Sequence, residues 1–378
     1  MPSECLIVTQ CFYPDVGGIE TMMTALADNC AAAGHPVTVI AERVRHEPAA
    51  SPPAKPYTIE RFGGPRPWRR WSKRMKLGSI LKERAEGIAG IFADSWKSVE
   101  ALPSRLNVPV SVLAHGMEFP VHASSGKKKR IAAALARADA VIANSHYTAK
   151  LVHPYLGARE DKLQIVHPAI DPMAEPSSGD LRAIRERIGG GDPVIVTVAR
   201  LEPRKGIDAV IGALPEILDR HPGCVYAVGG AGSDRGRLEE LAAEHNVRQS
   251  VIFLGRVTDA EKMALLSVAD VFAMPVRREG QSVEGFGISY LEAGWFGVPS
   301  LAGRDGGAAD AVLDGETGLV CDGANQDAVA GSLLSLLGDA ELRRTLGAAA
   351  QNRVKRELIW PVAIHRYLES FSKAASRA

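Results

Sequence analysis

The sequence has no uninterrupted apolar run of roughly 18 residues, so it offers no candidate transmembrane helix. Its five cysteines are scattered and contain no Cys-x-x-Cys pair, which argues against a zinc site or a disulfide framework and favours a reducing compartment. The formal net charge of the 378 residues is only +1, so no overall field would attract nucleic acid. No basic start followed by an apolar run opens the chain, so no secretory signal is expected.

What the sequence does contain is an alternation of apolar, β-branched runs with longer helical patterns. With 46% hydrophobic residues the chain can bury the cores of more than one domain. Helical patterns at 19–33 and 145–156 fall between runs of the first half, which predicts a doubly wound α/β domain. The predicted strands of this half are 5–9, 37–41, 90–93, 110–114, 140–144 and 163–167.

A polar, proline-bearing stretch at 167–180 interrupts this rhythm, after which the alternation restarts. We therefore predict an amino-terminal Rossmann-like domain over 1–171, a second over 172–357, and a carboxy-terminal helix over 358–378 that packs back on the first domain. Ligands of open α/β sheets bind outside the carboxyl ends of the strands, so two facing sheets predict a cleft between domains. The second domain has predicted strands at 193–199, 224–230, 250–255, 270–275 and 298–303, and helices at 207–220, 234–245 and 259–268.

Two features of the first domain lie where a strand is expected to end. Gly17 and Gly18 precede a helix in "FYPDVGGIE", where glycines allow backbone amides to approach an anionic or hydroxyl-rich ligand, although an ordinary tight turn has the same pattern. His115 follows a buried strand pattern in "VLAHGMEF" and could donate to a sugar hydroxyl or a developing charge, although isolated histidines are commonly structural.

The second domain opens with "VARLEPRKGID", a strand followed by a turn and a helix. Arg200 leaves the strand and Lys205 sits on the turn, so these two cations could flank the phosphates of a ligand at a helix amino terminus. The alternative is that both side chains are solvated, but cations there oppose the helix dipole and a bound anion would relieve them.

Glu284 and Glu292 lie in "EGFGISYLE", at the end of a glycine-broken loop. If the segment were helical throughout, its ends would lie about 12 Å apart, beyond the roughly 5 to 9.5 Å between the carboxylates of a glycosidase. We instead expect Glu284 to reach a sugar, Glu292 to accept hydrogen bonds from ribose hydroxyls, and the backbone amides of Phe286, Gly287 and Ile288 to contact the ligand.

Together these motifs resemble the GT-B glycosyltransferases of family 4, whose retaining members share a Gly-Gly loop, a histidine after an amino-domain strand, an Arg/Lys pair and an E-x7-E motif. The likeness covers nearly the whole chain and is strongest over 194–320. Three stretches are more narrowly similar to the phosphatidylinositol mannosyltransferases of the PimB type, which use GDP-mannose: "AHGMEF", "ARLEPRKGID" and "FAMPVRREGQSVEGFGISYLEAGWFGVP". The segment 60–105 and Trp295-Phe296 depart from the pattern of these enzymes, so the resemblance does not assign an inositol-lipid acceptor pocket to this chain.

The resemblance implies that the domain over 1–171 is the acceptor domain, that the domain over 172–357 is the nucleotide-sugar donor domain, and that these residues have the following roles. Arg200 and Lys205 would hold the diphosphate, Glu284 the sugar hydroxyls, Glu292 the ribose, and His115 the transferred hexose. Backbone around 254–259, which includes Val257, would recognise the base. The implied transfer of mannose retains the anomeric configuration and needs positioning and charge stabilisation more than a dedicated base. No metal or other cofactor is expected, in agreement with the lack of an Asp-x-Asp sequence.

An acid-free segment, "RPWRRWSKRMK" (66–76), indicates a further surface. Drawn as a helix, it has cations on one face and Trp68, Trp71 and Met75 on the other, which is typical of an interfacial helix on an anionic membrane. The alternative is a helix whose tryptophans face the core while its cations face water. The cations of this segment are Arg66, Arg69, Arg70, Lys73 and Arg74, and Lys127 to Arg130 add a second basic cluster.

We therefore expect a hexosyltransferase with a nucleotide-sugar donor and a lipid or glycan hydroxyl as acceptor, in the cytoplasm or peripheral on the inner face of the cell membrane. Neither nucleic acid nor a resident cofactor is expected. The alternatives are a family 4 transferase that uses a UDP-sugar (glucose, glucuronate or N-acetylglucosamine), a sugar phosphorylase or epimerase with the same fold, and a non-catalytic nucleotide-sugar binding protein.

Overall fold

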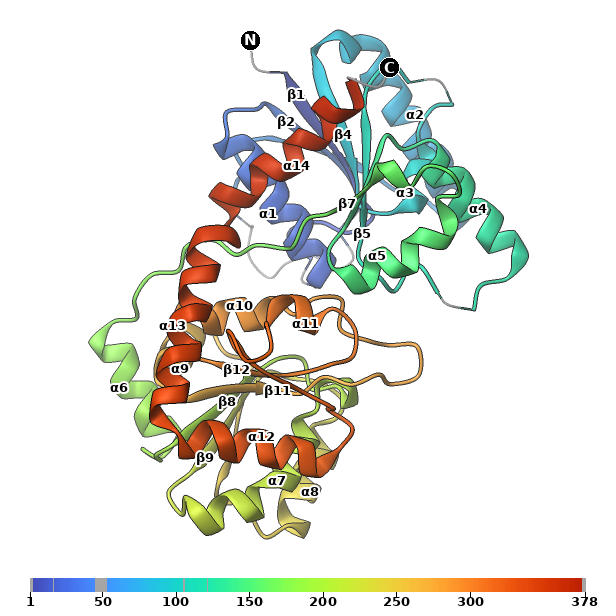
Figure 1. Cartoon of the computed structure of the whole chain (residues 1–378). Coiled ribbons are helices and arrows are strands. Elements are labelled where there is room, and N and C mark those ends of the chain that lie inside the picture. Colours follow the sequence, from blue (N-terminus) through green and yellow to red (C-terminus); the bar gives the residue numbers. More distant parts are fainter. Residues whose placement is uncertain (1–2, 16, 45–52, 105, 121, 376–378) are drawn as a thin grey trace. The chain divides into compact units, whose positions relative to one another are not determined.

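The computed structural model describes residues 3–15, 17–44, 53–104, 106–120 and 122–375. Its contacts divide the chain into two compact units (Figure 1). Unit 1 consists of Met1–Pro168 with Trp360–Ala378, and unit 2 consists of Ala169–Ile359. The divisions fall three and two residues from positions 171 and 357, where the sequence analysis divides the chain.

Within the described residues, unit 1 is built on a seven-stranded parallel sheet with the order β3-β2-β1-β4-β5-β6-β7. Its central strands are short apolar runs; every residue of β5, for example, is buried. Parallel strands with both faces covered need such continuous apolar runs, which explains why composition alone located most of them. The strands are β1 (Glu4–Val8), β2 (Val37–Glu42), β3 (Thr58–Phe62), β4 (Ile88–Ala93), β5 (Val110–Ala114), β6 (Ala140–Ala143) and β7 (Leu163–Ile165).

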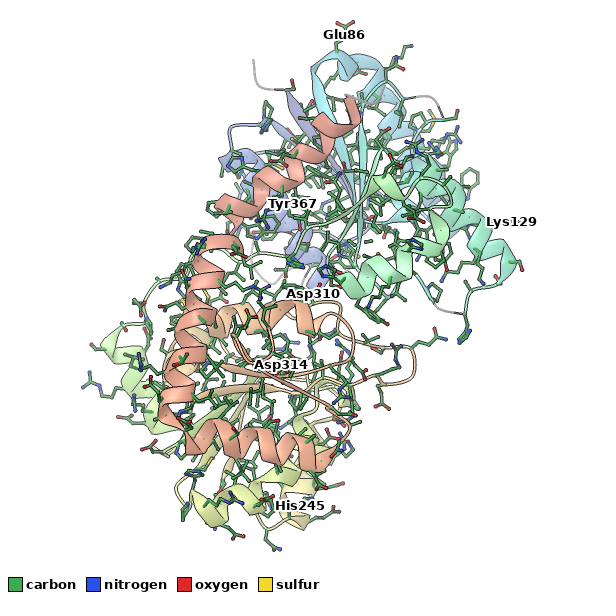
Figure 2. The ribbon with its side chains drawn as sticks, viewed as in Figure 1. Glu86, Lys129, His245, Asp310, Asp314 and Tyr367 are labelled. Carbon is green, nitrogen blue, oxygen red and sulfur yellow. The ribbon has the colours of Figure 1, made fainter. Side chains whose placement is uncertain are left out.

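Helices cover both faces of this sheet, and the carboxy-terminal helix α14 packs beside α1 (Figure 1). The close approach of α14 depends on Gly90 in β4, because a Cβ there would lie 2.3 Å from the ring of Phe371. Tyr367 of the same helix is fully buried (Figure 2). The helices of unit 1 are α1 (Gly18–Ala32), α2 (Arg66–Arg84), α3 (Trp96–Ala101), α4 (Ser125–Ala136), α5 (His146–Val152) and α14 (Trp360–Ala375), with 3-10 turns η1 (Ala85–Gly87), η2 (His153–Tyr155) and η3 (Glu160–Lys162).

Unit 2 repeats the plan with a six-stranded parallel sheet, in its described part, of order β10-β9-β8-β11-β12-β13. Apolar clusters fill both faces of the sheet, one under α7 and α12 and the other under α9 and α10. The strands are β8 (Val194–Val198), β9 (Val225–Gly229), β10 (Val251–Gly255), β11 (Val271–Met274), β12 (Ser300–Gly303) and β13 (Gly318–Cys321).

Side chains fix where several helices of unit 2 begin. Thr258 and Glu261 form a reciprocal capping box at the start of α9, and Ser177 and Asp180 form one at α6. The helices are α6 (Ser178–Arg187), α7 (Ile207–Arg220), α8 (Arg235–Glu244), α9 (Asp259–Ser267), α10 (Ile288–Trp295), α11 (Ala308–Ala311), α12 (Gln326–Gly338) and α13 (Ala340–Glu357), with the 3-10 turn η4 (Pro203–Lys205).

The predicted fold class, two Rossmann-like doubly wound α/β domains, is confirmed. Two strands were not predicted. β3 carries Glu60 and Arg61 at the sheet edge, and β13 is a four-residue strand that begins with glycine. β3 lacks the continuous apolar run of a central parallel strand. β13 has three consecutive apolar residues, Leu319 to Cys321, and the prediction missed it.

Candidate functional site

In unit 2 the strand order reverses between β8 and β11, which are adjacent at the centre of the sheet. Open α/β sheets bind ligands outside the carboxyl ends of the strands at such a topological switch point. The loops that follow these two strands carry Glu202, Arg204, Lys205 and Glu284, which we call the switch-point cluster. The sheet topology therefore brings together two of the motifs that the sequence analysis singled out.

The cluster is a charge network centred on the Glu284 carboxylate. Arg204 Nη1 donates to Glu284 Oε2 at 2.7 Å, and Lys205 Nζ donates to the same oxygen. Arg204 Nε also donates to Glu202 Oε2 at 2.9 Å. Arg204 and Lys205 are each only 8% exposed, so both cations lie out of bulk water and depend on these carboxylates for compensation.

Burial by itself would raise the pKa of Glu284, but Lys205 and Arg204 outweigh burial and lower the pKa of this carboxyl to about 2. Glu284 is therefore ionised at any physiological pH. An ionised carboxylate accepts hydrogen bonds, for example from hydroxyl groups, but has no proton to give as a general acid.

Glycines allow the surrounding loops to approach closely. Gly206 has φ 72° and a Cβ there would lie 2.2 Å from the carbonyl oxygen of Pro275, just after β11. Gly306 has φ 78° and a Cβ there would lie 2.2 Å from the carbonyl oxygen of Glu284, which also accepts a hydrogen bond from the Gly307 amide at 2.9 Å. Any side chain at Gly206 or Gly306 would displace a loop of the site.

A second ion pair ties the loop after β11 to the start of α7. Arg277 donates from both terminal nitrogens to Asp208, at 2.8 and 2.7 Å. Its backbone amide donates to the Arg204 carbonyl at 3.0 Å. This bidentate pair holds the segment before Glu284 against the segment that carries Arg204 and Lys205.

At Glu284, Lys205 is accompanied by a different arginine from the one that the sequence analysis paired with it. The side chain of Arg200, which we paired with Lys205, is 72% exposed and lies 2.7 Å from Glu202 Oε1. Arg204 contacts Glu284 beside Lys205, and the sequence analysis missed it. The available signal was its place in the same Pro-Arg-Lys turn, but sequence does not show which side chain of a turn points inward.

Glu292 belongs to a different charge pair. It lies on α10, and its Oε1 accepts a hydrogen bond from Lys262 Nζ of α9 at 2.6 Å. Although burial opposes the charge of Lys262, Glu292 and Asp259 raise the pKa of this lysine. Glu284 lies in the loop before α10 and Glu292 within that helix, and each contacts its own cations rather than forming a carboxylate dyad.

The segment that joins the two glutamates forms the amino end of α10. Gly287 has φ 97°, and a Cβ there would lie 2.5 Å from the Tyr290 ring, so a glycine is needed. Phe286 is only 2% exposed and packs in the core. Gly287 and Ile288 place their amides in the first turn of the helix, where no internal acceptor exists. Val257 lies half-buried in the loop between β10 and α9.

Unit 1 has its own switch point, between β1 and β4. Thr9 and the Gln10 amide, just after β1, donate to Asp94 Oδ2 at 2.9 and 2.7 Å. Asp94 is 3% exposed and also accepts a hydrogen bond from Ser98. A buried polar network thus marks the carboxyl end of these strands.

Lys73 belongs to this network, which corrects a prediction. We expected Lys73 on an exposed cationic face, but it is 4% exposed and donates to Ser98 Oγ at 2.7 Å. Burial lowers its pKa to about 8, although nearby Asp94 opposes that shift. The helix turns this face inward because Lys73 shares it with Leu77, Ile80 and Leu81 of the core.

The aromatic and apolar residues that the sequence analysis singled out in α2 are exposed. Trp68, Trp71 and Met75 are 62%, 59% and 56% exposed, and we call them the α2 stripe. The two indole rings pack edge to face with centroids 6.3 Å apart. Arg74 is exposed, whereas the side chains of Arg66, Arg69 and Arg70 lie outside the described residues.

His115 follows β5 in unit 1. Its backbone amide donates to Glu118 Oε1 at 2.6 Å, and its ring Nε2 is buried with no hydrogen-bond partner among the described residues. Buried polar atoms are rarely left unpaired, so this nitrogen is available to a ligand. Gly17 caps α1 with an extended backbone, and Gly18 begins that helix.

Comparison with known proteins gives the chain a family. The model of glycosyl transferases group 1 matches residues 182–353, and that of Glycosyltransferase Family 4 matches residues 16–173. A GDP-mannose-dependent monoacylated α-(1-6)-phosphatidylinositol monomannoside mannosyltransferase of Corynebacterium glutamicum is 30% identical over 95% of both chains.

One further sequence relative and one solved structure also match the chain. A GDP-mannose-dependent α-(1-6)-phosphatidylinositol monomannoside mannosyltransferase of Mycolicibacterium smegmatis is 41% identical, with the match spanning 57% of each chain. This chain thus matches little more than half the length of that relative. HepE of Anabaena, in a crystal structure with UDP and glucose, superposes with a TM-score of 0.76 at 20% identity, covering 98% of this chain and 99% of that one. The last comparison establishes the GT-B fold.

Proposed function

This chain belongs to glycosyltransferase family 4, and we propose that it transfers mannose from GDP-mannose to a hydroxyl of a phosphatidylinositol-type glycolipid, with retention of anomeric configuration. The observation that carries the proposal is the full-length likeness to a GDP-mannose-dependent mannosyltransferase. The switch-point cluster supports it, because its glutamate is ionised and can accept hydrogen bonds from sugar hydroxyls.

The donor is held, in this proposal, by the loops of unit 2. Glu284 accepts from the hydroxyls of the hexose, and Lys205 with Arg200 neutralises the diphosphate. Glu292 accepts from the ribose hydroxyls while the hydrogen bond from Lys262 orients its carboxylate. His115 donates from its unpaired Nε2 to the transferred hexose. Val257 and its neighbours contact the base through the backbone.

Retention follows from attack on the same face of the sugar that the diphosphate leaves. The C1–O bond to the diphosphate breaks, the C1–O bond to the acceptor forms, and the acceptor proton passes to an oxygen of the departing phosphate. Because the leaving group takes the proton, no protein general base is required, and the chain contributes position and charge compensation. We expect this reaction to proceed without an added divalent metal.

We also propose that the acceptor is met at the inner face of the cell membrane. None of the helices in the described part of the chain combines the length and apolarity needed to cross a bilayer. The α2 stripe supports a peripheral contact, since tryptophan is favoured at the membrane interface and exposed Arg74 would face anionic headgroups.

A thermal-shift panel with GDP, UDP, ADP and their sugar conjugates tests the donor assignment. A ligand that binds only the native state raises the melting temperature according to its affinity and concentration. We expect GDP and GDP-mannose to stabilise the protein most. Stabilisation by a UDP-sugar alone would instead make the chain a family 4 transferase with a UDP-glucose, UDP-glucuronate or UDP-N-acetylglucosamine donor.

A further inference from the structure

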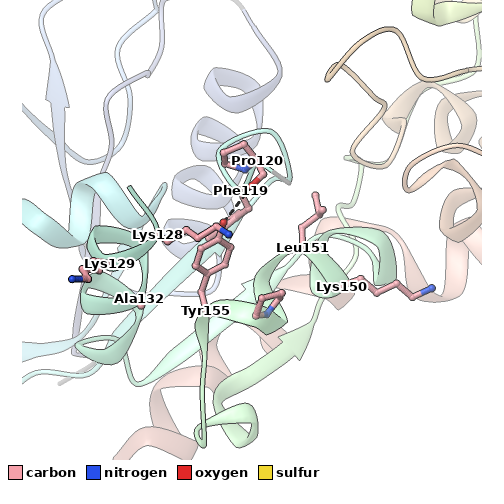
Figure 3. A pocket seen from close by; sticks show the side chains of 9 residues that line it. Phe119, Pro120, Lys128, Lys129, Ala132, Lys150, Leu151 and Tyr155 are labelled. Carbon is pink, nitrogen blue, oxygen red and sulfur yellow. Dashed lines mark hydrogen bonds between the residues drawn. The ribbon is translucent and has the colours of Figure 1, made fainter. Parts of the chain in front are cut away.

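Unit 1 contains a pocket of about 580 Å³ that none of the proposed donor-binding residues lines. It lies between α4, α5, η2 and the segment that follows His115, and Figure 3 shows Phe119, Pro120, Leu151 and Tyr155 around it. We call it the lysine-rimmed pocket. It is lined by Phe119, Pro120, Lys128, Lys129, Ala132, Lys150, Leu151, Pro154 and Tyr155.

The walls of the pocket are apolar. Phe119 is 1% exposed and its ring lies 6.0 Å from that of Tyr155, centroid to centroid. The Tyr155 hydroxyl donates to the Pro120 carbonyl oxygen at 3.3 Å, so it is already satisfied by the wall. Burial raises the pKa of Tyr155, which keeps this hydroxyl neutral. A ligand in the pocket would therefore contact mainly hydrocarbon.

The rim, in contrast, is cationic. Lys129 and Lys150 extend outward at opposite margins of the pocket in Figure 3, and Lys129 also projects from the molecule in Figure 2. In the described part of the chain, no carboxylate forms an ion pair with Lys128, Lys129 or Lys150. The nearby Arg130 differs, because Glu100 binds it through two hydrogen bonds.

The sequence of this region is strongly basic although the whole chain carries a net charge of only +1. Its one acid over 119–159, Asp139, accepts a hydrogen bond from the Val110 amide at 2.9 Å, at the amino end of β5 and away from the pocket. The same stretch contains seven Lys and Arg residues: Lys127, Lys128, Lys129, Arg130, Arg137, Lys150 and Arg159. The rim therefore favours an anion.

We propose that the lysine-rimmed pocket binds an acyl chain of the anionic glycolipid acceptor, with the lipid phosphate at the lysine rim. This inference rests on the proposed function. Apolar walls and unpaired surface cations match a ligand with a hydrocarbon tail beside a phosphate. A nucleotide fits poorly, because the walls offer no free polar side chain to a base.

A short segment connects the pocket to His115, which the proposed function places at the transferred hexose. Glu118 accepts from the His115 amide, and the next residue, Phe119, forms a pocket wall. Met117 between them is 69% exposed. A lipid whose sugar headgroup reaches His115 would therefore have apolar surface for its tail four residues further along the chain.

The pocket is tested directly by the binding of lysophosphatidylinositol to the full chain. Isothermal titration calorimetry measures this binding below the micellar concentration of the lipid and without the sugar donor. Glycerophosphoinositol lacks the acyl chain, and a monoacylglycerol of the same chain length lacks the phosphate. The variants are Ala132→Trp, which fills the pocket, and the double variant Lys129→Gln/Lys150→Gln, which neutralises the rim. Lys127→Gln is the matched control, because this lysine belongs to the same basic run but does not line the pocket.

We expect Ala132→Trp to weaken lysophosphatidylinositol binding at least about tenfold, because contact with the acyl chain is lost. The rim variant should weaken lysophosphatidylinositol binding by a smaller factor, and this factor should decrease as the salt concentration increases. The control should bind as the wild type does. Unchanged binding in both test variants, or equal affinity for glycerophosphoinositol and lysophosphatidylinositol, would overturn the proposal. Melting temperatures show whether each variant folds. If Ala132→Trp does not fold, the binding measured for the rim variant alone tests the proposal.

Transfer kinetics separate this inference from the proposed function. Ala132→Trp should raise the KM for a diacyl glycolipid acceptor but not for its deacylated form, with kcat unchanged. If no lipid accepts mannose from wild-type protein, the proposed function fails while the binding result still decides the pocket. If transfer occurs and Ala132→Trp leaves both KM values unchanged, the pocket assignment is wrong and the proposed function stands.

Discussion

At the scale of single residues, Glu284 is the best-defined group of the site. Two buried cations donate to one of its oxygens, so removing its charge leaves Lys205 and Arg204 without their main compensation. We expect Glu284→Gln to lower kcat by about a hundredfold or more, as for the loss of a well-placed electrostatic contact. Steady-state kinetics would measure this. Glu279→Gln, an exposed change in the same loop, is the control and should retain activity.

The depressed pKa of Glu284 also predicts a pH dependence of stability. The native pKa is about 2 and the unfolded value is about 4.3, so the stabilising contribution is fully present above the unfolded value and is lost as the pH falls towards 2. The stability advantage of wild type over Glu284→Gln should therefore shrink from about pH 5 downwards, by roughly 1.5 kcal/mol at pH 3 and by up to roughly 3 kcal/mol once the native carboxyl is protonated below pH 2. Urea unfolding at several pH values measures it, and a constant difference would contradict the assigned ion pairs.

Glu292 should affect affinity more than turnover. Its carboxylate lies on α10 and is paired with Lys262. In the proposed function it contacts the ribose, and its loss would remove a contact that persists from ground state to transition state. We expect Glu292→Ala to weaken nucleotide binding about tenfold with kcat little changed. Calorimetric titration with GDP measures the effect. A fall in kcat at unchanged GDP affinity would contradict the ribose assignment and indicate that Glu292 contacts the reacting end of the donor.

The sequence predicts the position of a residue after a strand, but it does not predict the direction in which the side chain points. His115, Lys205 and Glu284 all follow parallel strands, so sheet topology alone places them at a carboxyl edge. Whether Arg200 or Arg204 turns towards Glu284 depends on the geometry of the η4 turn. The sequence contains both candidates without ranking them.

At the scale of secondary-structure elements, α2 joins two environments. Its inner face carries Lys73 and packs on the core, while the α2 stripe is exposed. We expect Trp68→Ala/Trp71→Ala to reduce co-sedimentation with vesicles that contain anionic lipid about tenfold or more, with melting temperature unchanged. Lys82→Ala, an exposed change elsewhere on the helix, is the control. Equal sedimentation of the double variant and wild type would remove α2 as a membrane contact.

The carboxy-terminal helix α14 has a structural role that can be measured separately. The Phe371 ring packs 4.3 Å from that of Phe92 and lies over Gly90, within unit 1. The substitution Phe371→Ala should lower the free energy of unfolding by about 3 kcal/mol, because it leaves a cavity under the helix. Denaturant unfolding measures the loss, and Ser372→Ala, an exposed neighbour, should cost little. A loss no larger than that of the control would show that α14 does not depend on this contact.

The helix α2 also shows that a sequence pattern can leave the buried face of a helix undetermined. The segment separates its cations from its tryptophans, but the pattern does not say which face is inward. Leu77, Ile80 and Leu81 follow on the Lys73 side and bury that face, and they lie beyond the acid-free segment 66–76. The missed β3 lies beside α2, where Lys76 pairs with Glu60 at 2.6 Å. An edge strand that carries charged side chains gives no apolar signal.

At the scale of the whole molecule, the alternation of apolar runs and helical patterns was sufficient to predict two Rossmann-like domains. Each sheet has the same order at its centre, with the third, second and first strands followed by the fourth and fifth. The lysine-rimmed pocket was not predictable, because its walls come from elements with no common motif. The carboxyl edge of the unit 1 sheet carries His115 and that of the unit 2 sheet carries Lys205 and Glu284, which the proposed function assigns to the donor.

The central claim is that this family 4 chain is a retaining mannosyltransferase with a glycolipid acceptor. The most direct measurement incubates the purified chain with radiolabelled GDP-mannose and vesicles that contain phosphatidylinositol monomannoside, followed by extraction and α-mannosidase digestion of the lipid. The account predicts a labelled glycolipid from which α-mannosidase releases the label, formed by wild type and lost in Glu284→Gln. Transfer only from a UDP-sugar, or a product that α-mannosidase cannot cleave, would contradict it.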